Sequence, residues 1–137
     1  MSGRLPFFVY GTLRPGEHNH DLFLRGRTRS EAPGRLTGAV LYDGPGYPYA
    51  VEESGGLVCG ELVTADPDQY GQLLGALDQL EEYAPGDPAN LYERVARQVT
   101  RDDGTDVPAW VYVAAPTVAA ALRARGRRIH GGDWRTR

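Results

Sequence analysis

The sequence has no lysine, a single cysteine and no long apolar run. All fifteen basic residues are arginine, a bias typical of a bacterium with GC-rich DNA, so a lysine nucleophile or Schiff base is excluded. Cys59 has no second cysteine with which to form an internal disulfide. No stretch approaches the roughly 18 apolar residues of a membrane span, and the apolar stretch near the N-terminus is too short for a secretory signal. We therefore expect a cytoplasmic protein without a membrane partner.

Histidine and serine are also scarce, and their positions match none of the common catalytic motifs. The three histidines form no HExxH pattern and there is no CxxC, so no metal is expected. There is no Gly-x-Ser-x-Gly, and neither Ser30 nor Ser54 has a histidine nearby, which argues against a covalent hydrolase. The glycine-rich signatures GxxxxGK[ST] and GxGxxG are missing as well. The sequence therefore predicts a protein that uses no cofactor.

The charge balance argues against a nucleic-acid partner. Fifteen basic residues face eighteen acidic ones, for a net charge of −3, whereas duplex-binding proteins usually carry a basic surplus. Arginines do gather at residues 123–128, but no aromatic side chains interleave them, so a solvated tail is favoured over an RNA contact. Nothing in the sequence sets the oligomeric state.

Length and composition predict one domain. The 137 residues, 41% of them apolar, suffice for one hydrophobic core and leave little room for two. The chain has no internal repeat and no linker. We expect a single domain over residues 1–137, with its core at residues 5–115 and an Arg-rich C-terminal segment at residues 116–137.

Short strand patterns punctuated by glycine and proline dominate the chain. Strands are predicted at residues 5–10, 35–42, 57–63, 92–100 and 107–113, and the last two form a hairpin. Helices are predicted at residues 19–24, with Asn19 as the cap, at 66–80, with Asp66 as the cap, and at 117–125. This order indicates an α+β fold built on a compact barrel or a strongly bent sheet.

The predicted helix at residues 66–80 places one carboxylate on its apolar face. With Tyr70 at zero and about 100° per residue, Leu77 lies at about 340°. Glu81 then follows at about 20°, inside the apolar stripe, whereas Glu82 lies outside it at about 120°. A desolvated carboxylate has a pKa raised toward neutrality, which suits a group that must both accept and donate a proton.

Two structural alternatives for Glu81 stay open at this point. The helix can end at Leu80, in which case Glu81 turns toward solvent. Alternatively, Glu81 forms a buried ion pair with Arg94, because a buried carboxylate is costly unless it is paired or hydrogen-bonded.

The segment at residues 10–16 follows a predicted buried strand directly. Gly11 permits a close approach of the backbone to a ligand, and successive free amides in such a turn can bind an anion. Taken alone, a strand followed by Gly-Thr is a weak signal, because most such segments are only turns.

Six short motifs, in this order and spacing, resemble the gamma-glutamylcyclotransferase family over residues 7–113 and at the C-terminal end. They are Phe8-Val9-Tyr10-Gly11-Thr12-Leu13-Arg14, Gly46-Tyr47-Pro48, Leu77-Asp78-Gln79-Leu80-Glu81, Leu91-Tyr92-Glu93-Arg94, Ala109-Trp110-Val111-Tyr112 and Gly131-Gly132-Asp133-Trp134.

The resemblance implies an α+β single domain, a small mixed β-barrel with a few flanking helices and one cavity. It implies that the backbone amides of Tyr10, Gly11, Thr12 and Leu13 cradle a gamma-glutamyl group, and that Glu81 is the catalytic acid/base. This is the carboxylate that helical periodicity places on the apolar face, so two independent arguments select it.

The implied reaction is cyclisation of a gamma-glutamyl amine or gamma-glutamyl amino acid. The α-amine of the substrate attacks its own γ-carbonyl, and the products are 5-oxoproline and the free amine. Intramolecular attack supplies its own proximity, and one carboxylate can act first as base and then as acid. No metal, nucleotide or covalent intermediate is required.

Tyr47, Tyr92 and Arg94 are further substrate-binding candidates with supporting roles, the alternative being packing or a surface ion pair. Tyr49 departs from the family, in which many members carry a small residue after Gly-Tyr-Pro, and we expect it to narrow or reshape the pocket.

Two other functions remain as alternatives. A non-catalytic module could retain the same pocket and bind a small carboxylate ligand, although the core-facing Glu81 favours an enzyme. An RNA-contacting protein would use the C-terminal arginines, and its RNA binding would depend steeply on salt.

Overall fold

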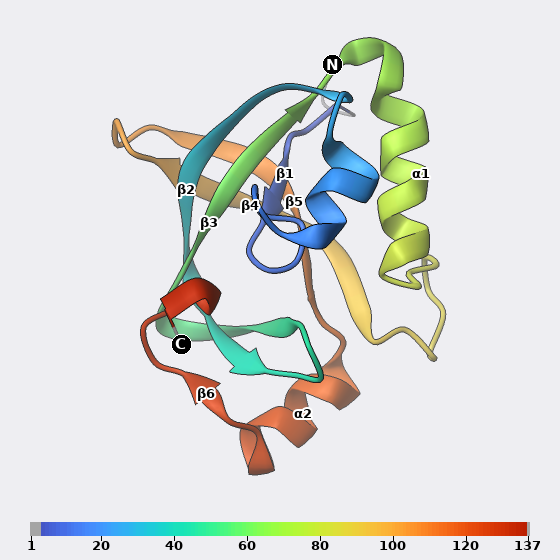
Figure 1. The fold of residues 1–137 in the computed structure, drawn as a ribbon. Coiled ribbons are helices and arrows are strands. Elements are labelled where there is room, and N and C mark those ends of the chain that lie inside the picture. Colours follow the sequence, from blue (N-terminus) through green and yellow to red (C-terminus); the bar gives the residue numbers. More distant parts are fainter. Residues whose placement is uncertain (1–3, 137) are drawn as a thin grey trace.

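The sheet of this protein closes on itself. In the computed structural model, which describes residues 4–136, six strands follow the order β3-β1-β5-β4-β2-β6, and β2 also pairs with β3 (Figure 1). Five strands therefore form a closed barrel, and β6 extends it at β2. The strands are β1 (Phe7–Val9), β2 (Thr28–Asp43), β3 (Pro48–Ala65), β4 (Tyr92–Arg101), β5 (Asp106–Ala114) and β6 (Arg128–Ile129). The predicted α+β class with a small mixed barrel is confirmed.

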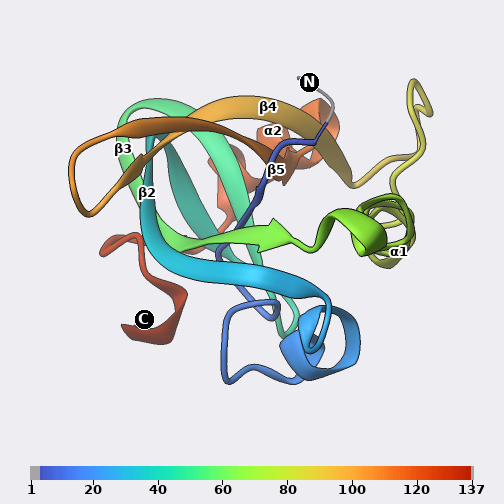
Figure 2. The same cartoon turned by 90° about the horizontal axis from the view of Figure 1, so that it is seen from above.

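The barrel is mixed because β1 lies parallel to β5, while all other neighbouring strands are antiparallel. The helices lie outside the barrel, and Figure 2 shows α1 on one side of the ring of strands. They are α1 (Tyr70–Leu80), α2 (Pro116–Arg125), the π-helical segment His20–Leu24 and the 3-10 turns Pro67–Gln69 and Trp134–Thr136. Among residues 4–136, no helix is long and apolar enough to cross a membrane.

The longest hairpin, β2 with β3, extends well beyond the strands predicted at residues 35–42 and 57–63. The prediction ended strands at glycines, whereas here glycines bend them. The register shifts between Thr37 and Ala39, and Gly38 between them has a φ of 81°. A Cβ on Gly56 would lie 2.1 Å from the carbonyl oxygen of Ala39. Glycine thus lets the two strands resume their pairing beyond an irregularity at which Gly38 and residues 53–56 have no partner in the ladder.

The hairpin of β4 and β5 is confirmed, with Tyr92 opposite Ala114 and Thr100 opposite Asp106. The two predicted caps, Asp66 and Asn19, stand at N-cap positions, but neither makes the side-chain bond of a cap. Asp66 precedes a 3-10 turn and makes no side-chain cap bond. Asn19 makes none either, because its amide donates to the Thr12 hydroxyl at 2.8 Å instead.

Alternation along the strands divides the core into two layers. One cluster packs side chains such as Phe8, Leu62 and Val111 together with Trp134 of the C-terminal segment. The other cluster packs the opposite faces of the strands against Tyr70, Leu73 and Leu77 of α1. The predicted apolar face of this helix is therefore confirmed, and it packs against one side of the barrel.

Replacing Leu73 by alanine should lower the free energy of unfolding by about 2–5 kcal/mol, because the side chain is fully buried and leaves a cavity. Leu22→Ala is the matched control: Leu22 is 69% exposed, so the change should stay within about 0.5 kcal/mol. Urea unfolding of both variants measures the difference. A Leu73→Ala protein as stable as the control would contradict the packing of α1 described above.

Candidate active site

A cavity of about 370 Å³ opens where the N-terminal strand and the end of α1 meet. Its wall is built from β1 and the turn that follows it, His18 and Asn19, the loop before β3, the last turn of α1, the start of β4 and one residue of β5. The predicted candidates in this wall are Tyr10, Gly11, Thr12, Leu13, Tyr47, Glu81 and Tyr92. The structure thus brings together seven of the eight candidate residues, and Arg94 lies outside the wall.

Three consecutive backbone amides lie free in the turn after β1. Among residues 4–136, the N–H groups of Gly11, Thr12 and Leu13 donate to no acceptor. The turn is closed by the N–H of Arg14, which donates to the carbonyl of Gly11 at 3.0 Å. Gly11 itself has no room for a side chain, since a Cβ would lie 2.6 Å from the Pro48 ring. Buried polar groups normally find partners, so such a set of donors suits an anionic or carbonyl ligand.

The end of α1 determines where Glu81 lies. The helix ends at Leu80, and the N–H groups of Glu82 and Tyr83 donate back to carbonyls of its last turn at 3.1 and 2.8 Å. This pattern is a Schellman motif, with Glu82 in the left-handed position at a φ of 54°. Glycine is usual there, because other residues pay a steric cost of about 1 kcal/mol. The turn leaves Glu81 in the cavity wall although the helix has already ended.

Glu81 is half-buried and has no counter-charge. Among the described residues its carboxylate makes no hydrogen bond and no ion pair, so neither alternative weighed for Glu81, turning to solvent or pairing with Arg94, describes it. Burial raises the pKa of Glu81 to about 7 because a desolvated carboxylate favours its neutral form. The group can therefore exchange a proton near neutral pH.

Tyrosines surround Glu81 and stay protonated. Burial raises the pKa of both Tyr10 and Tyr92, and the nearby Glu81 carboxylate adds to the effect. Tyr10 donates its hydroxyl hydrogen to the carbonyl of Tyr112 at 2.5 Å, and Tyr92 donates to the carbonyl of Pro48 at 2.9 Å. Neither hydroxyl is bonded to Glu81, so these tyrosines form the wall around the carboxylate.

Tyr49 does not itself line the cavity. Its ring stacks on Tyr92 at 4.9 Å between centroids and meets Tyr47 edge to face at 5.6 Å. Both of its neighbours do line the cavity. Tyr49 therefore supports the wall from behind, and the Tyr47 and Tyr92 rings it holds are the ones that face the ligand space.

Arg94 pairs with Asp78 at 2.8 Å between Nε and Oδ1, and its guanidinium lies 4.4 Å from the centre of the Trp110 ring. The same Asp78 oxygen accepts the Tyr112 hydroxyl at 2.6 Å. Neither Asp78 nor Tyr112 is among the candidates predicted from the sequence. The helical periodicity could have pointed to Asp78, because this residue lies only about 60° from Glu81 around the helix axis.

The ionisable side chains of the cavity wall other than tyrosines are those of Glu81, Glu82 and His18, and no arginine is among them. Across residues 4–136, no three His, Cys, Asp or Glu side chains are grouped so as to hold a metal ion. The site offers one carboxylate near its titration midpoint, three amide donors and a tyrosine wall. These groups can bind a carboxylate or carbonyl and move a proton.

Comparison with known proteins agrees with this arrangement. The profile of the family described as "Gamma-glutamyl cyclotransferase, AIG2-like" matches residues 7–136. The gamma-L-glutamyl-butirosin B gamma-glutamyl cyclotransferase of Niallia circulans is 38% identical over 107 residues, which cover 77% of this chain and 64% of that protein. The chain thus spans somewhat less than two thirds of that relative's length.

Two further proteins are similar. A candidate gamma-glutamylcyclotransferase of Halalkalibacterium halodurans is 42% identical over 96 residues, covering 69% of this chain and 76% of the relative. An AIG2-like protein of Mus musculus has a solved structure that superposes with a TM-score of 0.62 at 28% identity, covering 82% of this chain and 80% of that one. Since the family profile runs through nearly all of the described residues, the chain belongs to the gamma-glutamyl cyclotransferase, AIG2-like family.

Proposed function

We propose that this protein is a cyclotransferase that converts a gamma-glutamyl amine to 5-oxoproline and the free amine. The observation that carries the proposal is a carboxylate without a counter-charge, Glu81, whose pKa burial raises to about 7, in one cavity wall with three free amides. Family membership supports the same reaction class. Such an assembly suits a substrate that brings its own nucleophile and needs only folding, a proton carrier and donors.

The free amides of Gly11, Thr12 and Leu13 hold the glutamyl end of the substrate through its α-carboxylate. Three N–H donors can satisfy a carboxylate that no arginine in the wall reaches. The rings of Tyr47 and Tyr92 enclose the apolar part of the glutamyl chain. Folded over in this space, the α-nitrogen lies against the γ-carbonyl carbon of the same substrate.

Glu81 carries the proton in this mechanism. As a carboxylate it takes a proton from the α-ammonium group, and the neutral amine then attacks the γ-carbonyl carbon. When the tetrahedral intermediate collapses, protonated Glu81 gives that proton to the leaving nitrogen and the original C–N bond breaks. The ring nitrogen keeps one hydrogen, and the other proton departs with the basic amine product. A pKa near 7 suits both directions of transfer, because neither protonation state is strongly favoured.

The charges of the wall favour amines over amino acids as leaving groups. A gamma-glutamyl amino acid carries a second carboxylate, and the wall holds Glu81, Glu82 and His18 but no arginine to receive it. The guanidiniums of the buried Arg14 and the half-buried Arg94 are both paired with carboxylates elsewhere. The preferred substrate class is therefore a gamma-glutamyl amide of an amine without its own carboxylate.

Release of 5-oxoproline tests the proposal. The wild type should act on gamma-glutamyl amines faster than on gamma-glutamyl amino acids or glutathione, and Glu81→Gln should lose at least about 10²-fold in kcat/KM because it can no longer carry a proton. Mass spectrometry of the products across this panel, including gamma-L-glutamyl-butirosin B, measures both effects.

The matched control is Glu53→Gln, which removes an exposed carboxylate paired with Arg128 and should turn over like the wild type. Full activity of a folded Glu81→Gln protein would disprove the assigned role. A folded wild type that binds gamma-glutamyl amines without releasing 5-oxoproline would instead favour a binding module.

The raised pKa of Glu81 also predicts how stability depends on pH. Between about pH 4.5 and 7 the folded protein retains a proton on Glu81 that the unfolded chain releases, so this group's contribution to stability falls as the pH rises through that window. Relative to the wild type, Glu81→Gln should therefore gain about 1–3 kcal/mol in free energy of unfolding between pH 5 and pH 8. Urea unfolding at both pH values measures this, and a pH-independent difference would refute the assigned pKa.

A further inference from the structure

The turn that carries the free amides is anchored by a buried arginine. Among residues 4–136, Arg14 is the one charged side chain that is buried, at 6% exposure. It does not line the cavity, so it is not part of the ligand-binding wall. A buried ion pair adds little net stability, because desolvating the charges offsets their attraction. Its presence here therefore calls for an explanation other than stability.

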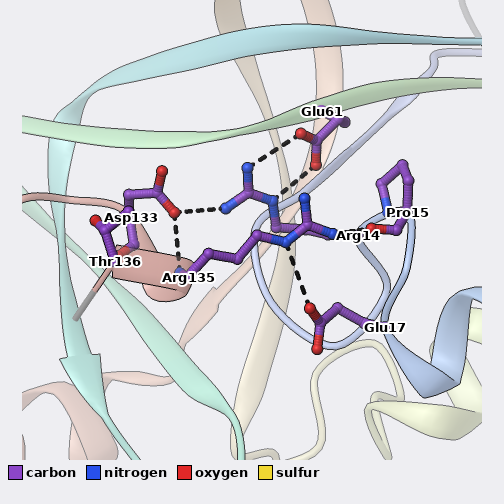
Figure 3. Close-up of polar contacts among 7 residues, drawn as sticks. All are labelled: Arg14, Pro15, Glu17, Glu61, Asp133, Arg135 and Thr136. Carbon is purple, nitrogen blue, oxygen red and sulfur yellow. Dashed lines mark hydrogen bonds and ion pairs between the residues drawn. The ribbon is translucent and has the colours of Figure 1, made fainter.

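Arg14 holds two carboxylates from distant parts of the chain (Figure 3). Its Nε and Nη2 donate to the two oxygens of Glu61 in β3 at 2.8 and 3.0 Å. Its Nη1 donates to Oδ1 of Asp133, 119 residues away, at 2.7 Å. Paired contacts of this kind fix both the position and the orientation of a guanidinium. Since these two carboxylates take up the donors of the Arg14 fork and Arg14 does not line the cavity, its effect on the site is geometric.

The backbone of Arg14 is part of the same turn as the free amides. Its N–H closes the turn on Gly11, and its carbonyl accepts the N–H of Glu17 at 2.9 Å. Fixing the side chain of Arg14 therefore fixes the end of the segment that presents the amides of Gly11, Thr12 and Leu13.

The C-terminal segment holding Asp133 is itself firmly seated. The carbonyl of Gly132 accepts the N–H of Cys59 in β3 at 2.8 Å, and a Cβ on Gly132 would lie 2.0 Å from the carbonyl oxygen of Leu57. Trp134 is buried in the core. Arg135 reaches across to the loop after Arg14, donating to the carbonyl of Pro15 and to the Glu17 carboxylate. Figure 3 shows this second arginine beside the first.

We propose that Arg14 is a positioning residue and that Asp133 makes the C-terminal segment, residues 131–136, a working part of the site. The clamp of Arg14 between Glu61 and Asp133 sets the spacing of the three amides, and with it the affinity for the substrate's α-carboxylate. This inference rests on the proposed function.

Asp133→Asn tests the clamp with two small probes, 5-oxoproline and 2-pyrrolidinone, which lacks the carboxylate. The wild type should bind 5-oxoproline at least about 10-fold more tightly than 2-pyrrolidinone, since only the first engages the amides. Asp133→Asn should lose most of this preference for 5-oxoproline, while its affinity for 2-pyrrolidinone stays unchanged. In turnover of a gamma-glutamyl amine, it should raise KM more than it lowers kcat. Isothermal titration and 5-oxoproline release measure these quantities.

Two comparisons make the test specific. Asp102→Asn breaks an exposed pair with Arg35 and should match the wild type in every respect. Arg14→Lys keeps the positive charge but loses the planar guanidinium that donates to two carboxylates. If the role of Arg14 is geometric, this variant should also lose the preference for 5-oxoproline over 2-pyrrolidinone. We expect Asp133→Asn to fold, because Arg14 keeps Glu61. Should it not, Arg135→Gln, at an exposed side chain, must show a smaller loss in the same direction.

A folded Asp133→Asn or Arg14→Lys protein with the wild-type binding ratio would overturn the positioning role alone. If Asp133→Asn does not fold, an Arg135→Gln protein with the wild-type preference for 5-oxoproline over 2-pyrrolidinone would also overturn the positioning role. A wild type that binds both probes equally would overturn the proposed carboxylate site and the clamp together.

Discussion

Glu81 holds its carboxylate in the cavity wall with no cation beside it, and the surrounding structure is arranged to preserve that condition. The guanidiniums of Arg94 and Arg14 are both occupied elsewhere, Arg94 by Asp78 and Arg14 by Glu61 and Asp133. If either reached Glu81, an opposite charge would lower its pKa and hold it ionised. Because both guanidiniums are held by other carboxylates, the pKa of Glu81 stays near neutral pH, as a proton carrier requires.

The cavity wall also keeps Glu81 without a partner. Closing the barrel brings β1, β4 and β5 together with the end of α1, so Glu81 and the residues with free amides line one cavity. The tyrosine hydroxyls of Tyr10 and Tyr92 bond to backbone carbonyls and leave Glu81 without a donor. Aromatic rings then desolvate the carboxylate without neutralising it, which is how a single acidic group can serve as base and acid in turn.

Local patterns predicted the features that depend on neighbouring residues. The apolar stripe of α1 and the direction of Glu81 follow from helical phase, and the β4–β5 hairpin follows from its turn. Glu81 kept its direction although the helix ends at Leu80, because the residue still has helix-like φ and its N–H still bonds to Leu77 at 3.0 Å. Its catalytic role stays a prediction.

Features that depend on contacts between distant parts of the chain could not be predicted from local sequence patterns. The partner of Arg94 depended on which carboxylate the closed barrel brought near, and the Arg14–Asp133 contact joins opposite ends of the chain. The extent of β2 and β3 was underestimated because glycines that usually end strands here bend them. In each case contacts between distant parts of the chain overrode the local preference.

The central claim is that Glu81 titrates near neutral pH because it is desolvated and lacks a counter-charge. Carbon-13 NMR of the side-chain carboxyl groups, recorded from pH 3 to 9 and assigned by comparison with Glu81→Gln, measures this directly. We predict a midpoint of about 7 for Glu81. A midpoint near 4.5, the ordinary value of a glutamate, would contradict it.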